Sequence, residues 1–252
     1  MDLFYTSPDC IDEELGELVV EGEEFHHIVR VLRRSVGDTI YVTDGRGLCA
    51  RAAIRSVDKR RLRAEMLSCE RLQPPPARLT IALSLLKSPQ RFDFFLEKAT
   101  ELGVDRIVPM VSSRTVSRAR GDKARRKTER WRNLLVSASR QTKRFYLPLI
   151  TEPVSFQEVL AMEAEHDVAC IAHESSLEVP CGEMSGSNVL FLVGPEGGFS
   201  STEVGQALEA GFQAVSLGPS ILRAETAALC AAAFVRMGRL GTTGCGETSM
   251  KR

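Results

Sequence analysis

Apolar runs and amphipathic stretches alternate over the second two thirds of the chain. Apolar runs of strand length lie at residues 79–86, 106–110, 168–172, 189–193 and 214–217. The stretches between and after them that predict helices are residues 91–102, 123–140, 156–165, 202–209 and 224–237. Strands that alternate with helices indicate a parallel sheet covered by helices on both faces. We therefore expect an α/β domain in this part of the chain.

The first third of the chain has a different pattern. Short apolar or alternating runs at residues 18–20, 39–42, 48–57 and 61–67 predict strands, and residues 26–34 predict one short helix. Three consecutive prolines, Pro74 to Pro76, form a stiff segment that neither a helix nor a central strand tolerates. We expect a small, mostly β domain at residues 1–73, the α/β domain at 77–240 and a disordered tail at 241–252.

The composition excludes several classes of protein. The 252 residues are 43% hydrophobic and 26% charged, as in ordinary globular domains, which argues against a disordered or collagen-like chain. No apolar run approaches the roughly 18 residues of a membrane helix, and the acidic N-terminus is unlike a leader peptide, so we expect a cytoplasmic protein. Seven cysteines without a CxxC pair and four histidines without ligand spacing predict no metal site.

Charge is segregated along the chain although its formal sum is zero. Residues 25–64 contain ten Lys or Arg against three Asp or Glu, and residues 114–144 contain twelve against two. Residues 145–222 contain eleven acidic residues and no Lys or Arg. Basic clusters of this size favour a nucleic-acid partner, because cations that neutralise phosphates release counterions. The alternative is a solvated basic helix that pairs with acidic parts of the chain or of another subunit.

A glycine-marked loop follows the apolar run at residues 189–193. Residues 194–198 read Gly-Pro-Glu-Gly-Gly, and the S-x-x-E pattern at residues 200–203 predicts a capping box at the start of the next helix. The loop lacks the Lys-Ser/Thr pair of a phosphate-binding loop and carries Glu196, so nucleotide phosphates are disfavoured. Glycines allow a ligand to approach the backbone closely. The alternative is a tight turn without a ligand.

A second loop of similar character follows the next predicted strand. Gly218 and Pro219 shape a turn, Ile221 and Leu222 offer an apolar wall for a flat ring, and Arg223 and Glu225 open an alanine-rich helix. Ligands of parallel sheets bind at the carboxyl ends of the strands, so the two loops predict one pocket. The alanines at residues 224–233 make a strong helix that permits close packing, within the chain or against a second subunit.

These two loops together resemble the paired signature of the RsmE family of SPOUT methyltransferases. The resembling segments are residues 193–199 (VGPEGGF) and 217–227 (LGPSILRAETA), with supporting matches at residues 27–33 and 98–104 and at Trp131, Gln141, Arg144 and Pro148. The resemblance extends over the chain up to Leu240. One departure is that Arg140 and Lys143 stand where the family usually has an acidic and a small residue.

The resemblance implies a function that composition and periodicity do not. It implies methylation of uridine N3 in 16S ribosomal RNA of an assembled or partly assembled small subunit, with S-adenosylmethionine as cofactor. It also implies a homodimer, a PUA-like β-barrel at residues 1–73, and a deep trefoil knot in the C-terminal sheet. Knots are nearly absent from proteins, so no sequence pattern predicts one.

The resemblance and the charge pattern together assign residues to roles. Cofactor-binding residues are expected to be His173, Leu192, Gly194, Glu196, Gly198, Leu217, Gly218, Ile221, Leu222 and Ala227. RNA-binding residues are expected to be His27, Arg30, Arg33, Lys87, Arg91, Arg114, Arg140 and Lys143. The predicted catalytic residues are Arg223, Glu225 and Arg144.

The catalytic assignment follows from the chemistry of uracil. Its N3 is protonated at neutral pH, so a cation near the carbonyl oxygens would stabilise the anion that attacks the methyl group. Arg223 is expected to do this, Glu225 to accept the proton or orient the ligand, and Arg144 to hold flanking phosphate. Each could instead be a helix-end charge or a surface ion pair.

Two other functions remain open at this point. One is a non-catalytic RNA-binding or ribosome-assembly factor that keeps the knot as a scaffold. The other is a knotted methyltransferase that acts on transfer RNA or on a ribose 2′-hydroxyl. The intact glycines of both loops, with Leu222-Arg223, favour the enzyme over the first, and the loop at residues 194–198 together with the N-terminal domain favours RsmE over the second.

Overall fold

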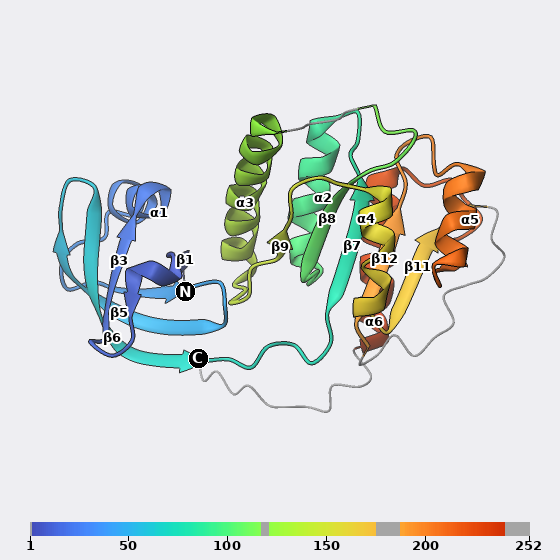
Figure 1. Ribbon diagram of the computed structural model, residues 1–252. Coiled ribbons are helices and arrows are strands. Elements are labelled where there is room, and N and C mark those ends of the chain that lie inside the picture. Colours follow the sequence, from blue (N-terminus) through green and yellow to red (C-terminus); the bar gives the residue numbers. More distant parts are fainter. Residues whose placement is uncertain (1, 117–120, 175–186, 240–252) are drawn as a thin grey trace. The chain divides into compact units, whose positions relative to one another are not determined.

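The computed structural model describes residues 2–116, 121–174 and 187–239 (Figure 1). The tail predicted at residues 241–252 lies outside the described residues. The chain forms two compact units, one of Met1–Pro75 with Leu135–Leu147 and one of Pro76–Leu134 with Pro148–Arg252. The helix α3 (Asp122–Thr142) begins in the second unit and ends in the first.

The first unit is built on a six-stranded sheet, and the sequence pattern predicts four of its strands but neither β1 nor β2. The strands are β1 (Leu3–Tyr5), β2 (Ile11–Asp12), β3 (Glu17–Glu21), β4 (Thr39–Thr43), β5 (Leu48–Val57) and β6 (Arg61–Arg71). Their order is β1-β4-β5-β6-β3-β2, antiparallel except for the parallel pair β1 and β4. Buried side chains alternate along β3, along β5 up to residue 52 and along the first half of β6, and they form the core of this unit.

The predicted helix at residues 26–34 is wrong in its bounds. The structure has α1 at Gly22–His26, continued by one π-helical stretch at His27–Val31. A short 3-10 helix also lies at Pro8–Cys10. Gly22 begins α1 with a φ of 66°, a conformation that glycine adopts without strain, and this start has no apolar periodicity to reveal it.

The end of α3 and the turn after it are integrated into the first unit. The backbone N–H of Gly47 donates to the carbonyl oxygen of Phe145 at 2.9 Å, and the N–H of Leu147 donates to Gly45 at 2.9 Å. The hydroxyl of Tyr146 donates to the carbonyl oxygen of Leu72 at 2.6 Å. A segment far along the chain therefore completes the N-terminal unit.

The second unit is a parallel sheet, which confirms the predicted fold class. Its strands are β7 (Leu79–Ser84), β8 (Arg106–Val111), β9 (Leu149–Ile150), β10 (Val154–Ser155), β11 (Val168–Ala172), β12 (Val189–Val193) and β13 (Gln213–Val215). The order is β10-β8-β7-β12-β11-β13, with β9 also beside β8, and every pairing is parallel. All residues of β7 and β12 are buried, as expected for central strands.

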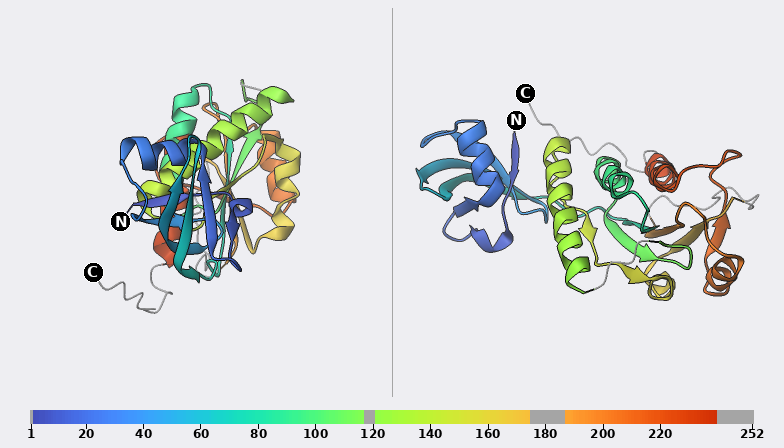
Figure 2. Two further views of the ribbon diagram at one scale, coloured as in Figure 1. Left: turned by 90° about the vertical axis from the view of Figure 1, so that its left-hand side faces the viewer. Right: turned by 90° about the horizontal axis from the view of Figure 1, so that it is seen from above.

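Helices cover both faces of this sheet. The helices α2 (Pro89–Glu101) and α6 (Ala224–Arg239) lie on one face, and α4 (Phe156–Leu160) and α5 (Ser201–Glu209) lie on the other (Figure 2). The largest buried side chain, Trp131 of α3, packs against Phe92 of α2 with ring centroids 4.7 Å apart. The knot implied by the resemblance stays a prediction.

Three predicted elements of this unit are shorter than expected, and the first is the strand predicted at residues 79–86, which ends at Ser84. The helix predicted at residues 156–165 ends at Leu160, and only a 3-10 turn at Glu163–Glu165 follows it. The strand predicted at residues 214–217 ends at Val215, because Ser216 and Gly218 form a turn in which the Gly218 N–H donates to the Ser216 hydroxyl at 3.3 Å. Within the described ranges, no helix has the length and apolar character that a membrane crossing requires.

Candidate functional site

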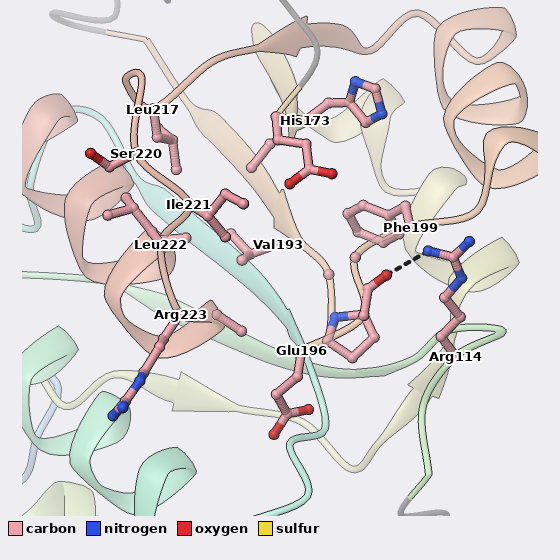
Figure 3. Close-up of a pocket in the computed structure, with 18 of the residues that line it drawn as sticks. Arg114, His173, Val193, Glu196, Phe199, Leu217, Ser220, Ile221, Leu222 and Arg223 are labelled. Atoms are coloured by element: carbon pink, nitrogen blue, oxygen red, sulfur yellow. Dashed lines mark hydrogen bonds between the residues drawn. The ribbon is translucent and has the colours of Figure 1, made fainter.

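A cavity of about 560 Å³ lies where strands β11, β12 and β13 end (Figure 3). Both glycine-marked loops line it, so the structure brings the two predicted loops together. The predicted residues around it are His173, Gly194, Glu196, Gly198, Leu217, Gly218, Ile221, Leu222, Arg223 and Ala227, with Arg91 and Arg114. In the described part of the chain, no group of His, Cys, Asp or Glu side chains is arranged to hold a metal ion.

The first loop folds back tightly on itself. The N–H of Gly198 donates to the carbonyl oxygen of Pro195 at 2.8 Å, and Gly198 has a φ of 66°. A Cβ on Gly194 would lie 3.1 Å from the backbone of Gly198 and Phe199. The requirement for glycine at position 194 therefore comes from the return of the loop itself.

Two neighbouring strand ends hold this loop from outside. The Glu196 carboxylate accepts a hydrogen bond from the backbone N–H of Lys87, after β7, at 3.0 Å. The Arg114 guanidinium, after β8, donates to the carbonyl oxygen of Gly197 at 2.5 Å (Figure 3). The sequence assigned Glu196 to the ligand and Lys87 to RNA. The structure adds that the two are bonded to each other through the Lys87 backbone.

The second loop presents apolar side chains to the cavity. Gly218 has a φ of 117°, a conformation that strains any residue with a Cβ, although a Cβ there would meet no atom within 4 Å. Leu217 and Leu222 are half-buried, whereas Ile221 is 87% exposed. The cavity thus has one apolar wall from residues 217–222 and one wall of glycine-rich backbone.

The start of α6 carries the charged groups beside the cavity. Glu225 is buried in the first turn of α6 and is not among the residues that line the cavity. Its Oε1 lies 3.7 Å from Nε of Arg91, which does line it. Its other oxygen, Oε2, has no hydrogen-bond partner among the described residues. Figure 3 shows the Arg223 side chain directed away from Val193 and His173. Arg223 makes no side-chain hydrogen bond or ion pair with any residue that the structure describes.

The remaining predicted residues are not among those that line the cavity. Leu192 is fully buried inside β12, and its neighbour Val193 lines the cavity in its place. Six of the residues predicted to bind RNA or to act in catalysis belong to the first unit: His27, Arg30, Arg33, Arg140, Lys143 and Arg144. Their assignments stay predictions.

Three of the cations in the first unit have distinctive surroundings or backbone conformations. Nη1 of Arg140 lies 2.7 Å from Oε1 of Glu24, a buried carboxylate of α1. Lys143 and Arg33 are exposed, and they are the non-glycine residues with positive φ in the described ranges, at 53° and 55°. Each follows the end of a helix, where a left-handed residue is usually glycine.

Sequence reasoning missed several lining residues. They are Ala172, Glu174, Val193, Pro195, Gly197, Phe199, Ser220 and Ala224. Ala172 and Val193 are the last residues of β11 and β12, so strand ends alone would have pointed to them. Phe199 is buried against Phe156, with ring centroids 5.6 Å apart; it belongs to the resembling segment at residues 193–199, but no site role was assigned to it.

Known proteins resemble both units. The family of RNA methyltransferase domains matches residues 73–236, and the family of RNA methyltransferase PUA domains matches residues 20–67. Ribosomal RNA small subunit methyltransferase E of Bacillus subtilis is 32% identical over 231 residues, covering 87% of this chain and 89% of that protein. The enzyme of the same name from Mycobacterium bovis is 32% identical over 237 residues, covering 91% and 88%.

A solved structure is also similar. The crystal structure of a ribosomal RNA small subunit methyltransferase E from Neisseria gonorrhoeae, bound to S-adenosylmethionine, has a TM-score of 0.83 and 31% sequence identity. The match covers 95% of this chain and 98% of that one.

Proposed function

The chain belongs to the ribosomal RNA small subunit methyltransferase E family, and we propose on this basis that it methylates N3 of a uridine in 16S ribosomal RNA. The methyl donor is S-adenosylmethionine. The observation that carries the proposal is the cavity formed by both glycine-marked loops at the carboxyl ends of three parallel strands.

The cavity fits this cofactor. Its volume lies in the range of small-molecule sites, and at Gly218 and Gly198 no side chain fills the space beside the backbone. Val193, Leu217 and Leu222 would contact the flat adenine ring, while His173, Glu174 and Ser220 offer polar groups. When bound, S-adenosylmethionine supplies a methyl group on a positively charged sulfur, so the main task of the protein is alignment.

The uracil base needs a cation, and three guanidinium groups line the cavity. Arg91 lies beside Glu225, and Arg114 is bonded to Gly197. Arg223 has no such partner in the described residues, which supports its assignment to the uracil carbonyl. A cation there stabilises the N3 anion and so lowers the cost of losing the proton.

Glu225 is the proposed proton acceptor or ligand-orienting carboxylate. It is buried at the first turn of α6, and one of its oxygens lacks a partner in the described residues. A buried carboxylate oxygen without a hydrogen-bond partner is energetically costly, which supports a functional role for Glu225.

The RNA surface is proposed to lie on the first unit and on the basic helix α3. Arg30, Arg33 and Lys143 are exposed there, and the PUA-type family match covers the same unit. Arg140 already has Glu24 as a partner, so Lys143 is the better phosphate ligand at this helix end. Arg144 is proposed to hold phosphate next to the target uridine.

A homodimer is proposed from an exposed apolar face of the second unit. Phe94 of α2 is 49% exposed, and Phe234 and Met237 of α6 are 39% and 71% exposed. The two helices pack against each other, and large apolar side chains exposed together mark interaction surfaces. A second copy of the chain would cover this face.

The experiment that tests the function uses small ribosomal subunits from cells that lack this protein. Incubation with the protein and S-adenosylmethionine should create 3-methyluridine in 16S ribosomal RNA, detected by nucleoside mass spectrometry. Gly194→Val protein should not create it. A methyl group found on a ribose or in transfer RNA would select the related knotted class. RNA binding without any methyl transfer would select an assembly factor.

A further inference from the structure

The carboxylate of Glu203 joins two segments that are about 90 residues apart. Glu203 lies in the first turn of α5 and is only 6% exposed. Its Oε1 accepts the backbone N–H of Ser113 at 2.7 Å, and its Oε2 accepts the Ser113 hydroxyl at 2.8 Å. Oε2 also accepts the N–H of Ser200 at 2.9 Å, which completes the capping box of α5. The capping pattern was visible in the sequence, but the bonds to Ser113 were not.

Ser113 belongs to a tight turn that is fixed on several sides. The N–H of Thr115 donates to the carbonyl oxygen of Ser112 at 3.1 Å, and the N–H of Ser112 donates to the Thr115 hydroxyl at 2.9 Å. The hydroxyl of Ser84, at the end of β7, lies 3.1 Å from that of Ser112. Glu203 thus accepts hydrogen bonds from both donors of Ser113, its backbone N–H and its hydroxyl, and the next residue of this turn is Arg114.

These hydrogen bonds form a closed circuit, a ring of bonded residues, that includes the end of the first glycine-marked loop (residues 194–198). Arg114 donates to the carbonyl oxygen of Gly197, three residues before Ser200, and Ser200 is bonded to Glu203. From Glu203 the circuit returns through Ser113 to Arg114. Phe199 lies inside this circuit, buried against Phe156. Glu203 therefore supports the loop at two points. It bonds directly to Ser200, where the loop enters α5, and it acts through Ser113 and Arg114 on the carbonyl oxygen of Gly197.

Hydrogen bonding keeps the Glu203 carboxylate charged. Burial acts to raise its pKa, but the bonds from the backbone and side chains of Ser200 and Ser113 outweigh burial and lower the pKa. An ionised acceptor of several hydrogen bonds makes stronger contacts than a neutral one.

We propose that Glu203 is a positioning residue of the methyl-donor site, which through Ser113 and Arg114 holds the loop at residues 194–198 in the shape that accepts the cofactor. The proposal rests on the proposed function for the identity of that cofactor. Glu203 itself lies outside the residues that line the cavity, so its effect is transmitted by Arg114 and by the start of α5.

The chain contains a matched control for this proposal. Glu158 forms a second capping box, on α4, in which its carboxylate accepts the N–H of Ser155 at 2.7 Å. Glu158 is exposed and belongs to the same unit, but it has no bond to a cofactor loop. Glu158→Gln and Glu203→Gln thus make the same change in the same kind of cap, a neutral amide in place of a carboxylate, and only the second weakens the bonds to Ser113.

The test is calorimetric titration of S-adenosylmethionine into the wild-type, Glu203→Gln, Glu158→Gln and Ser113→Ala proteins. We expect Glu203→Gln to weaken binding about ten-fold or more, since hydrogen bonds to a charged group are lost. Ser113→Ala, which retains its backbone N–H, should weaken binding less, and Glu158→Gln should bind as wild type does. Circular dichroism checks that each variant is folded. If Glu203→Gln does not fold, the affinity of Ser113→Ala for S-adenosylmethionine decides the test.

Arg114→Ala and its combination with Glu203→Gln complete the design. Because both changes act on one loop through one circuit, their effects on cofactor affinity should be clearly less than additive. Unchanged affinity in Glu203→Gln and Ser113→Ala, an equal loss in Glu158→Gln, or full additivity with Arg114→Ala would overturn the proposal. Wild-type protein that fails to bind S-adenosylmethionine would instead contradict the proposed function.

Discussion

The guanidinium of Arg140 and the carboxylate of Glu24 form an ion pair of 2.7 Å that fixes the last turn of α3 to α1. The side chains are 25% and 12% exposed, so the pair is largely removed from water. Burial raises the pKa of Glu24, and the charge of Arg140 partly opposes that rise. Arg140 therefore stabilises a carboxylate that the fold has taken out of solvent.

Removing Arg140 should destabilise the first unit. In the Arg140→Ala protein the Glu24 carboxylate would stay buried without its counter-charge. We expect the free energy of unfolding at neutral pH to fall by about 1–3 kcal/mol. Denaturant unfolding followed by circular dichroism measures this.

The loss should depend on pH in a defined direction. Without the guanidinium, the folded-state pKa of Glu24 rises further above its unfolded value. A raised carboxyl pKa contributes stability that is present below the unfolded pKa and is lost as pH rises through the folded pKa. The deficit of Arg140→Ala relative to wild type should thus shrink as pH falls through the pKa of Glu24. A deficit equal at pH 7 and pH 4 would show that the charge of Glu24 is not the cause.

Two glycine substitutions should abolish cofactor binding for different reasons. In Gly194→Val the side chain would collide with the backbone of Gly198 and Phe199, and in Gly218→Val the left-handed φ of 117° would be lost. Calorimetry with S-adenosylmethionine should detect no binding by either variant, while circular dichroism retains the wild-type spectrum.

Gly205→Ala is the control for these two variants. Gly205 lies in α5, and a Cβ there would meet no atom within 4 Å. Alanine should raise the free energy of unfolding by about 0.5–1 kcal/mol and leave cofactor affinity unchanged. If both valine variants bind S-adenosylmethionine with wild-type affinity, the assignment of the two loops to the cofactor site is wrong.

The α/β fold was predictable because its central strands are buried and mostly apolar. All residues of β7 and β12 are buried; β12 is a continuous apolar run, and β7 is apolar except for Thr80 and Ser84. By contrast β9, β10 and β2 have two residues each, which is too short for any periodicity. The sequence pattern also gave no sign that residues 135–147 complete the first unit, since long-range pairings such as Gly47 with Phe145 leave no local signal.

The candidate site was predictable from glycine and strand ends, but its supports were not. Gly194 and Gly218 mark loops, and loops after parallel strands converge. Ser113 and Arg114 follow a different strand, and nothing in their sequence spacing indicates that Glu203 and Gly197 are their partners.

Two basic residues should lower the stability of the fold while contributing to RNA binding. Arg33 and Lys143 adopt the left-handed conformation, which costs a residue with a Cβ roughly 1 kcal/mol. Arg33→Gly and Lys143→Gly should therefore leave stability unchanged or raise it. Each should nevertheless weaken binding to 16S ribosomal RNA fragments and lower the salt dependence by about one unit per lost phosphate contact.

Arg55→Ala is the charge-matched control for the glycine variants. Nε of Arg55 donates to the Glu65 carboxylate at 2.6 Å, so this cation already has a partner. We measure RNA affinity at several salt concentrations by fluorescence anisotropy for all three variants. Removal of Arg55 should change the slope of log affinity against log salt concentration less than either glycine variant does. Equal salt-dependence slopes for Arg33→Gly, Lys143→Gly and Arg55→Ala would show that the RNA surface does not include the helix ends at Arg33 and Lys143.

The last prediction concerns the proposed dimer and the part of Arg144. Residues 145–222 contain no Lys or Arg, so phosphate ligands near the cofactor loops must come from elsewhere in the chain or from a second copy. If Arg144 of one copy serves the cofactor loops of the other, a two-fold dimer holds two composite sites. Activity would then require dimerisation, and two inactive variants could complement each other.

A mixture of Gly218→Val and Arg144→Ala subunits makes this testable. In a mixed dimer, one composite site combines the intact loops of the Arg144→Ala copy with Arg144 of the other copy. Random mixing of equal amounts makes half of the dimers mixed, so the preparation should regain about a quarter of the wild-type rate of 3-methyluridine formation. If native mass spectrometry finds mixed dimers and the rate stays at that of the parents, Arg144 serves the site of its own chain or none, because only action across the dimer leaves one site whole.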